Sequence, residues 1–89
     1  MYKLETTTRF NKEYKNLSQK DREKTNEVIQ KLLKGEKLEK KYKEHNLKGE
    51  FKDYKECHIK PDLLLVYRYK NSEFVLLCVR VGSHSKLFG

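Results

Sequence analysis

The first residues of the chain alternate between apolar and charged positions, which is the two-residue period of a β-strand. The period then changes to that of a helix, because Phe10, Tyr14 and Leu17 recur at helical spacing. Thr7 or Thr8 is expected to cap the start of this short helix with its hydroxyl. The chain therefore begins with a strand that leads directly into an amphipathic helix.

A second helix is expected almost immediately afterwards. Ser18 and Asp21 have the spacing of a capping pair, and Gly35 is a typical C-terminal helix signal. The apolar stripe between them consists of Val28, Ile29, Leu32 and Leu33. Because hardly any linker separates the two helices, we expect them to form a hairpin. Residues 36–48 are polar, with charges of alternating sign, and favour a solvated, irregular loop.

From Gly49 onward the pattern returns to that of strands. Residues 51–60 alternate, with Cys57 and Ile59 on the face expected to meet the helices. His58 lies on the opposite face of the same strand. This segment therefore predicts a strand with one buried and one more polar face.

Two further strands are predicted after it. Residues 63–69 and 74–81 are largely apolar on both faces, as expected for central strands. Turn residues at 61–62 and 71–72 separate the strands. The tail that starts at Gly82 has room for one turn of helix at most.

The expected element order is β-α-α-β-β-β, which is an α+β fold. Three consecutive strands predict an antiparallel meander, which the first strand joins to complete an antiparallel sheet. The helical hairpin covers one face of this sheet and leaves the other face exposed. A length of 89 residues suits a single domain, so we assign residues 1–89 to one unit.

The charge balance points to a polyanionic partner. The net charge is +8, from 21 Lys and Arg against 13 Asp and Glu, which favours nucleic acid or an acidic protein. No apolar run approaches the about 20 residues of a membrane span, and the N-terminus lacks the apolar stretch of a signal peptide. We therefore expect a cytoplasmic protein with no membrane partner.

The two cysteines are expected to be reduced thiols in such a protein. Cys57 is predicted to lie in the core. Cys78 shares its strand face with Arg80 by parity, so we expect it to be partly exposed. Neither thiol is assigned a catalytic role.

Three histidines lie in segments that the meander brings close together: His45, His58 and His84. Imidazoles titrate near neutral pH, so a pair of them can give and take protons. Arg80, two residues before Gly82, presents a planar guanidinium fork to phosphate, and Asp62 can orient a histidine. A ribonuclease that works without metal needs these parts: a base for the 2′-hydroxyl, an acid for the 5′-oxygen and a cation for the phosphorane.

Other interpretations of the histidines stay open. They can be surface residues without a role, since histidine is often half-exposed. Three histidines can also bind zinc, although their separation along the chain and their basic surroundings disfavour this. We expect no metal and no cofactor. A general RNA-binding module is disfavoured because the aromatic ladder and the Gly-rich or RNP signals are missing.

Lysines and one tyrosine are candidates for RNA contacts. Lys48, Lys52 and Lys60 flank the proposed site and can meet substrate phosphates. Tyr54 shares a strand face with His58 and can stack on a base or pack on a neighbouring side chain. Most lysines of the two helices lie away from the apolar stripes. They can form a solvated face or a contact surface for ribosomal RNA. These lysines are Lys12, Lys15, Lys20, Lys24, Lys31 and Lys34.

Three motifs carry a resemblance to a known family. They are YKEHNLKG at 42–49, CHIKPD at 57–62, and RVGSH at 80–84 with the ending LFG at 87–89. In this order and spacing, over nearly the whole chain, the sequence resembles the YafQ family of bacterial type II toxins, within the RelE/ParE superfamily. The resemblance implies a RelE/ParE-like fold and a ribosome-dependent endoribonuclease that cleaves translated mRNA. It also implies neutralisation by a cognate antitoxin.

The resemblance further implies roles for individual residues. His84 would donate a proton to the leaving oxygen. His58, assisted by Asp62 or His45, would be the base. The partners would be mRNA on the translating ribosome, ribosomal RNA and the antitoxin.

Arg80 and Phe88 complete the implied site: Arg80 would stabilise charge on the phosphate, and Phe88 would position or stack on a base. Two positions depart from the family pattern, because Asn46 replaces a frequent Pro and Leu63 stands where relatives can carry Trp. Neither removes an acid–base group. The alternative is a non-catalytic basic protein of the same fold, which targets gyrase or only binds its antitoxin.

Overall fold

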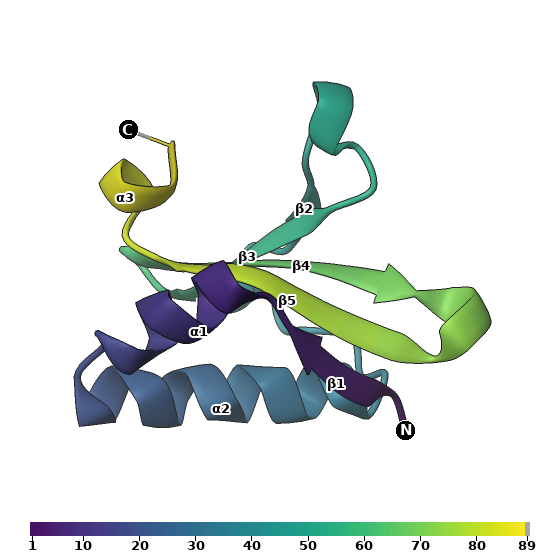
Figure 1. The fold of residues 1–89 in the computed structure, drawn as a ribbon, viewed down its shortest axis with the longest axis horizontal. Helices are drawn as coiled ribbons and strands as arrows, with labels where there is room; N and C mark the ends of the chain where they lie inside the picture. Colours follow the sequence, from purple (N-terminus) through teal and green to yellow (C-terminus); the bar gives the residue numbers. More distant parts are fainter. Residues whose placement is uncertain (89) are drawn as a thin grey trace.

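The computed structural model describes residues 1–88, so Gly89 of the LFG ending lies outside the described residues. Figure 1 shows a sheet with α1 and α2 on one face and α3 on the other. The strands are β1 Lys3–Thr6, β2 His45–Asn46, β3 Lys55–Lys60, β4 Leu63–Lys70 and β5 Val75–Gly82. The helices are α1 Thr8–Lys15, α2 Gln19–Leu33 and α3 His84–Phe88, with 3₁₀ turns at Lys40–Tyr42, Gly49–Phe51 and Asn71–Glu73. The predicted α+β fold and its helical hairpin are confirmed.

Local capping explains where the two long helices begin. The Thr7 hydroxyl accepts a hydrogen bond from the backbone N–H of Phe10 at 2.9 Å, so Thr7, not Thr8, is the cap. The Ser18 hydroxyl accepts from the N–H of Asp21 at 3.1 Å, as predicted. After α2 the backbone turns at Gly35, whose φ of +73° is one that glycine adopts without strain.

The sheet has the strand order β1-β5-β4-β3-β2. The neighbouring pairs from β2 to β5 are antiparallel, as predicted. β1 instead runs parallel to β5, with Lys3 opposite Val75 and Thr6 opposite Cys78, so the expectation of an antiparallel sheet is wrong for this strand. A parallel pair needs a long crossover connection, which the chain between β1 and β5 supplies.

The main core lies between α2 and the sheet. Val28 and Leu32 of α2 and Leu65 and Leu76 of the central strands are at most 1% exposed. A second, smaller cluster on the opposite face contains Leu64, Val66 and Leu87. Within residues 1–88, none of the helices combines the length and apolar character that crossing a membrane requires.

A β-bulge in β5 overturns one prediction about side-chain direction. Val66 pairs with Arg80 and the next residue, Tyr67, pairs with Cys78, so Val79 is the extra residue. The alternation therefore shifts after Cys78, which is fully buried in the main core together with Val81. Cys78 is thus not partly exposed, and it does not share a face with Arg80. Arg80 instead joins the open face of the sheet.

Residues 36–48 are less solvated than their charge pattern predicts. Leu38 and Tyr42 are both buried in the main core, and Tyr42 lies in the Lys40–Tyr42 3₁₀ turn. The predicted strand at 51–60 begins only at Lys55. Phe51 lies in a 3₁₀ turn with about half of its surface exposed.

Candidate functional site

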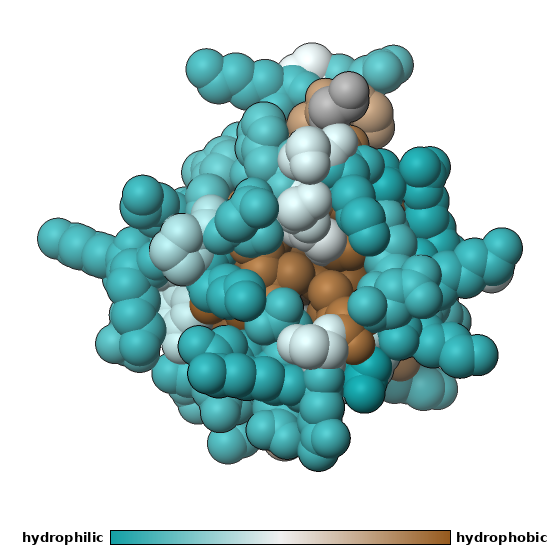
Figure 2. All heavy atoms as spheres, turned by 90° about the vertical axis from the view of Figure 1, so that its left-hand side faces the viewer, coloured by the Kyte–Doolittle hydropathy of each residue, from teal (hydrophilic) through white to brown (hydrophobic). Residues whose placement is uncertain are grey.

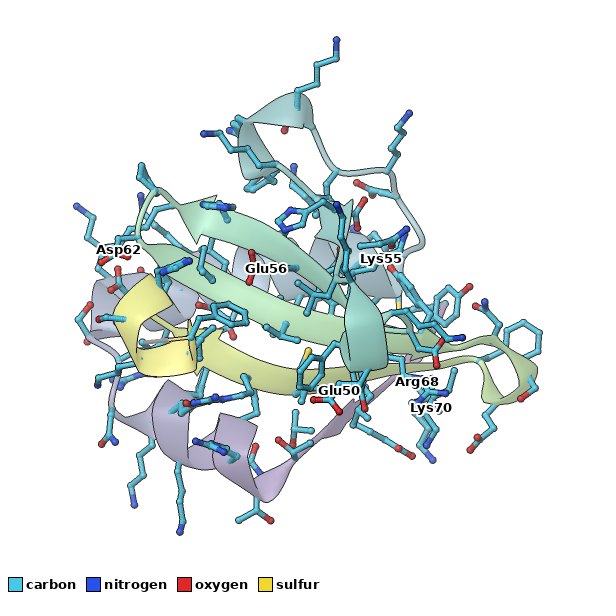
Figure 3. The ribbon with its side chains drawn as sticks, turned by 90° about the horizontal axis from the view of Figure 1, so that it is seen from above. Glu50, Lys55, Glu56, Asp62, Arg68 and Lys70 are labelled. Carbon is cyan, nitrogen blue, oxygen red and sulfur yellow. The ribbon has the colours of Figure 1, made fainter. Side chains whose placement is uncertain are left out.

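The open face of the sheet carries a row of residues in register across four strands, and three of the four are polar. His45 of β2 pairs with Glu56 of β3, Glu56 pairs with Val66 of β4, and Val66 pairs with Arg80 of β5. Figure 1 shows that α3 and the β2 segment rise from this same face, and Figure 3, seen from above, shows Glu56 near the middle of it. The row thus places an imidazole, a carboxylate and a guanidinium on one surface.

Glu56 is the partner of His45. The Oε1 atom of Glu56 lies 3.3 Å from Nε2 of His45, and Nδ1 of His45 lies 2.9 Å from the carbonyl oxygen of Lys43. Glu56 is only 6% exposed, and its Oε2 has no hydrogen-bond partner among residues 1–88. A buried carboxylate in this position can hold the imidazole in one orientation. The alternation of residues 51–60 puts Glu56 on the same strand face as His58, but nothing in the sequence distinguishes it from the other acidic residues.

A buried tyrosine anchors the loop that carries His45. The hydroxyl of Tyr67 donates a hydrogen bond to Oε2 of Glu44, the residue before His45. Burial, and next this hydrogen bond, raise the pKa of Tyr67 above its ordinary value. The hydroxyl therefore stays protonated and continues to hold Glu44.

Arg80 is held by a carboxylate of α1. Its Nη2 lies 2.6 Å from Oε2 of Glu13 and its Nε lies 3.4 Å from Oε1. The same Oε1 accepts from the backbone N–H of Val81 at 3.2 Å. Both side chains of the pair are less than one-fifth exposed. Nothing in the sequence pointed to Glu13, because no local pattern links a helix residue to a partner 67 positions away.

Arg80 and Asp62 together fix α3. The guanidinium donates to the carbonyl oxygens of Leu87 at 3.3 Å and Lys86 at 3.4 Å. Oδ1 of Asp62, in the β3–β4 turn, accepts from the backbone N–H of His84 at 3.2 Å. Figure 2 shows this end of the molecule, where hydrophilic side chains surround a small apolar area. The helix that carries His84 is therefore tied down at both of its ends.

The aromatic residue of α3 lies beside its histidine. The rings of His84 and Phe88 are 5.4 Å apart and tilted by 48°. Both residues are exposed. The structure therefore groups four predicted residues: Asp62, Arg80, His84 and Phe88.

His58 is not part of the contacts that join Asp62, Arg80, His84 and Phe88. Its Nδ1 lies 3.4 Å from the carbonyl oxygen of Pro61, and it lines a hollow that Lys24 and Lys41 also line. Within residues 1–88, no hydrogen bond or ion pair joins any two of the three imidazoles. Nor do the described residues contain a group of three or more His, Cys, Asp or Glu side chains arranged to hold a metal ion.

The candidate RNA-binding residues have different environments. Lys48 and Lys52 flank the Gly49–Phe51 turn and are exposed. Nζ of Lys60 lies 2.8 Å from Oδ1 of Asp21, so this lysine is already paired with a helix carboxylate. Tyr54 packs against Phe51, with ring centres 6.3 Å apart, and the guanidinium of Arg68 lies 5.8 Å from its ring centre.

Replacing Glu13 should destabilise the protein and loosen α3. We expect Glu13→Gln to lower the free energy of unfolding by about 1.5–3 kcal/mol, because it weakens hydrogen bonds to a charged partner that is little exposed. Urea unfolding followed by circular dichroism measures this change. The matched control is Glu39→Gln, which removes the exposed pair with Lys31 and should leave the stability nearly unchanged. Equal losses in the two variants would show that the Glu13–Arg80 pair has no special role.

Fold and site together define a small basic α+β protein with imidazole, carboxylate and guanidinium groups on the open face of its sheet. Residues 2–89 match the family described as "Bacterial toxin of type II toxin-antitoxin system, YafQ". The chain therefore belongs to the YafQ family of type II toxins, and the resemblance noted in the sequence is confirmed.

Individual relatives agree with this assignment. The mRNA interferase toxin YafQ of Escherichia coli K12 is 42% identical over 48 residues, which is 54% of this chain and 50% of that protein. The chain thus matches about half the length of this curated relative. The crystal structure of a metal-bound toxin from Helicobacter pylori is 44% identical, with a TM-score of 0.86 over 99% of this chain and 100% of that one. YafQ in the E. coli DinJ–YafQ complex is 31% identical, with a TM-score of 0.87 and full coverage of both chains.

Proposed function

We propose that this protein is a ribosome-dependent endoribonuclease that cleaves translated mRNA and is neutralised by a cognate antitoxin. The observation that carries the proposal is the arrangement around α3, where Arg80 and Asp62 hold His84 and Phe88 at one end of the open face. Family membership supports it, since the E. coli relative is an mRNA interferase. A net charge of +8 suits contacts with both mRNA and ribosomal RNA.

In the proposed reaction a base removes the proton from the 2′-hydroxyl, and the 2′-oxygen attacks phosphorus. The bond from phosphorus to the 5′-oxygen breaks, and this oxygen takes a proton from His84. Arg80 stabilises the charge on the phosphorane, and Phe88 positions a base of the substrate. The products are a 2′,3′-cyclic phosphate and a free 5′-hydroxyl.

Two imidazoles are candidates for the base. His58 has the position that the family motif implies, but the only hydrogen-bond partner of its ring among residues 1–88 is the Pro61 carbonyl. His45 has a buried carboxylate partner in Glu56, which orients it and stabilises its positive charge after proton transfer. We therefore add Glu56 to the proposed site as a positioning residue for His45.

The antitoxin is proposed to cover the basic surface with an acidic or amphipathic segment. The E. coli relative is found in a complex with DinJ, which supports a protein partner of this kind. Such a segment would block the open face of the sheet and keep mRNA away from Arg80.

Primer extension on a defined mRNA in a bacterial translation extract tests the proposal. Adding the protein should produce cuts in phase with codons, and an inhibitor of translation or the purified antitoxin should remove them. Intact mRNA in an actively translating extract would contradict the nuclease and favour the non-catalytic binding protein. Cuts that persist when translation is blocked would contradict ribosome dependence alone.

A further inference from the structure

One threonine contacts two consecutive carbonyl groups of β5 at its bulge. The backbone N–H of Thr7 donates to the carbonyl oxygen of Cys78 at 3.1 Å. The Thr7 hydroxyl donates to the carbonyl oxygen of Val79, the bulge residue, at 2.7 Å. Successive carbonyls of a regular strand point to opposite edges, so two on the same side mark the place where a bulge breaks the alternation. Thr7 therefore contacts β5 where its side chains change faces.

The Thr7 hydroxyl supplies a donor that a regular ladder does not provide. Val79 is the extra residue of the bulge, and an extra residue lies outside the regular pairing of two strands. A backbone carbonyl that is partly removed from water needs a hydrogen-bond donor from elsewhere. Because the hydroxyl of Thr7 is this donor, the bulge is stabilised by a side chain from the end of β1.

The same hydroxyl also marks the start of α1. It accepts the hydrogen bond from the backbone N–H of Phe10 at 2.9 Å. A hydroxyl has one proton to donate and lone pairs that accept, so it can form both hydrogen bonds at once. Figure 1 shows α1 leaving the end of β1 beside β5. One side chain thus fixes the start of α1 and the bulge of β5 relative to each other.

This connection places Glu13 opposite Arg80. Arg80 follows the bulge residue directly and lies on the open face because of the bulge. Glu13 lies in the second turn of α1, and its carboxylate binds both the Arg80 guanidinium and the backbone N–H of Val81. A change in the bulge or in the start of α1 would move one partner of this pair away from the other. The Thr7 hydroxyl holds both ends of the arrangement.

We propose that Thr7 is a positioning residue that holds the bulge of β5 and thereby keeps the Arg80 guanidinium on the open face. The consequence for cleavage rests on the proposed function, in which Arg80 stabilises the phosphorane. The structural part concerns hydrogen bonds within the free protein, so it is tested without ribosomes. Thr7 acts through Arg80 and is not assigned a contact with RNA.

Four variants separate the two hydrogen bonds of the hydroxyl. Thr7→Asp keeps an N-cap acceptor for α1, but a carboxylate cannot donate to the Val79 carbonyl. Thr7→Val removes both hydrogen bonds without adding charge, and Thr7→Ser keeps both. Ser18→Ala is the matched control, because it removes the N-cap of α2 and leaves both hydrogen bonds of Thr7 in place.

Hydrogen exchange and NMR of the free protein measure the effect, with the Leu65 amide in the buried centre of β4 as the internal reference. In Thr7→Asp and Thr7→Val, exchange of the Val81 amide relative to Leu65 should rise about 2- to 12-fold, the equivalent of one net hydrogen bond. The Nε–H signal of Arg80 should shift in both variants. Thr7→Ser and Ser18→Ala should keep the wild-type exchange ratio and the wild-type Arg80 signal.

Three results would overturn positioning by Thr7. The first is an unchanged exchange ratio and Arg80 signal in Thr7→Asp, which would show that the bulge forms without the hydroxyl. The second is an equal change in Ser18→Ala, which would reduce the effect to a general loss of helix stability. The third is an Arg80 shift in Thr7→Asp that is missing in Thr7→Val, which would assign the shift to the added charge.

Cleavage distinguishes the failure of this proposal from the failure of the proposed function. Thr7→Asp should lower the maximal rate of single-turnover cleavage on programmed ribosomes and leave the half-saturating protein concentration unchanged, because the phosphorane exists only in the reaction itself. A wild-type rate despite a shifted Arg80 signal would overturn the role of Thr7 in the reaction. A shifted Arg80 signal in a protein whose wild-type form cuts no mRNA would support positioning by Thr7 and contradict the nuclease.

Discussion

His84→Ala should reduce codon-phased cleavage of mRNA by about 10²–10⁴-fold, the usual contribution of a general acid or base. His84 lies at the start of α3, where its backbone N–H is fixed by Asp62 and its ring lies beside Phe88. The imidazole is exposed and has no carboxylate partner among residues 1–88, so it can approach the leaving oxygen. Single-turnover primer extension on programmed ribosomes measures the rate of cleavage. Ser85→Ala, an exposed neighbour in the same helix, is the control and should keep the wild-type rate.

A modified substrate decides whether His84 acts as the acid or as the base. When sulfur replaces the 5′-oxygen at the scissile bond, the leaving group departs without a proton. His84→Ala should then cleave this substrate nearly as fast as the wild-type protein does. A persistent defect on the sulfur substrate would show that His84 is not the general acid. Variants of His45 and His58 should keep their defect on it, since they are the candidate bases.

The periodicity of the chain predicted most of the fold because the determinants of its helices and central strands are local. The Thr7 and Ser18 hydroxyls cap helices whose apolar stripes follow at once, and Gly35 ends the second helix. Local patterns failed where one residue breaks the alternation. The bulge at Val79 shifts Arg80 to the opposite face of β5, and the residue types around Val79 do not indicate a bulge.

The site was predictable only in part, because local patterns do not reveal contacts between elements that lie far apart in the sequence. The motifs supplied the residue types that can move protons and bind phosphate, and these include Arg80 and His84. The carboxylates that hold these side chains come from other elements. Glu13, the partner of Arg80, lies on α1, and Glu56 lies one strand away from its partner His45. A single sequence does not reveal such long-range pairs. The site is therefore held by carboxylates that look like ordinary surface residues in the sequence.

Raising the pH from 8 to 11 should destabilise the protein by about 5 kcal/mol through its two thiols alone. Burial, the first cause in both cases, raises the pKa of Cys57 and of Cys78 from 9.0 to about 12. Above pH 9 the unfolded chain releases these protons while the folded chain retains them, so the free energy of unfolding falls as pH rises. Each thiol contributes about 1.4 kcal/mol per pH unit, hence about 2.7 kcal/mol at pH 11. Tyr69, whose pKa burial raises to about 12, adds to the loss above pH 10.

Urea unfolding at pH 8, 9, 10 and 11 measures this loss, and the Cys57→Ala/Cys78→Ala double variant isolates the thiols. The variant should be less stable than the wild-type protein at pH 8, because two small cavities open in the core. Its stability should then fall by about 5 kcal/mol less between pH 8 and 11, since lysines and tyrosines titrate equally in both proteins. The same loss in both proteins would show that the thiols ionise as easily in the folded state as in the unfolded one. That result would contradict the burial of both thiols in the core between the sheet and α2. It would also contradict the packing of this core beneath β3 and β5, which carry the proposed site.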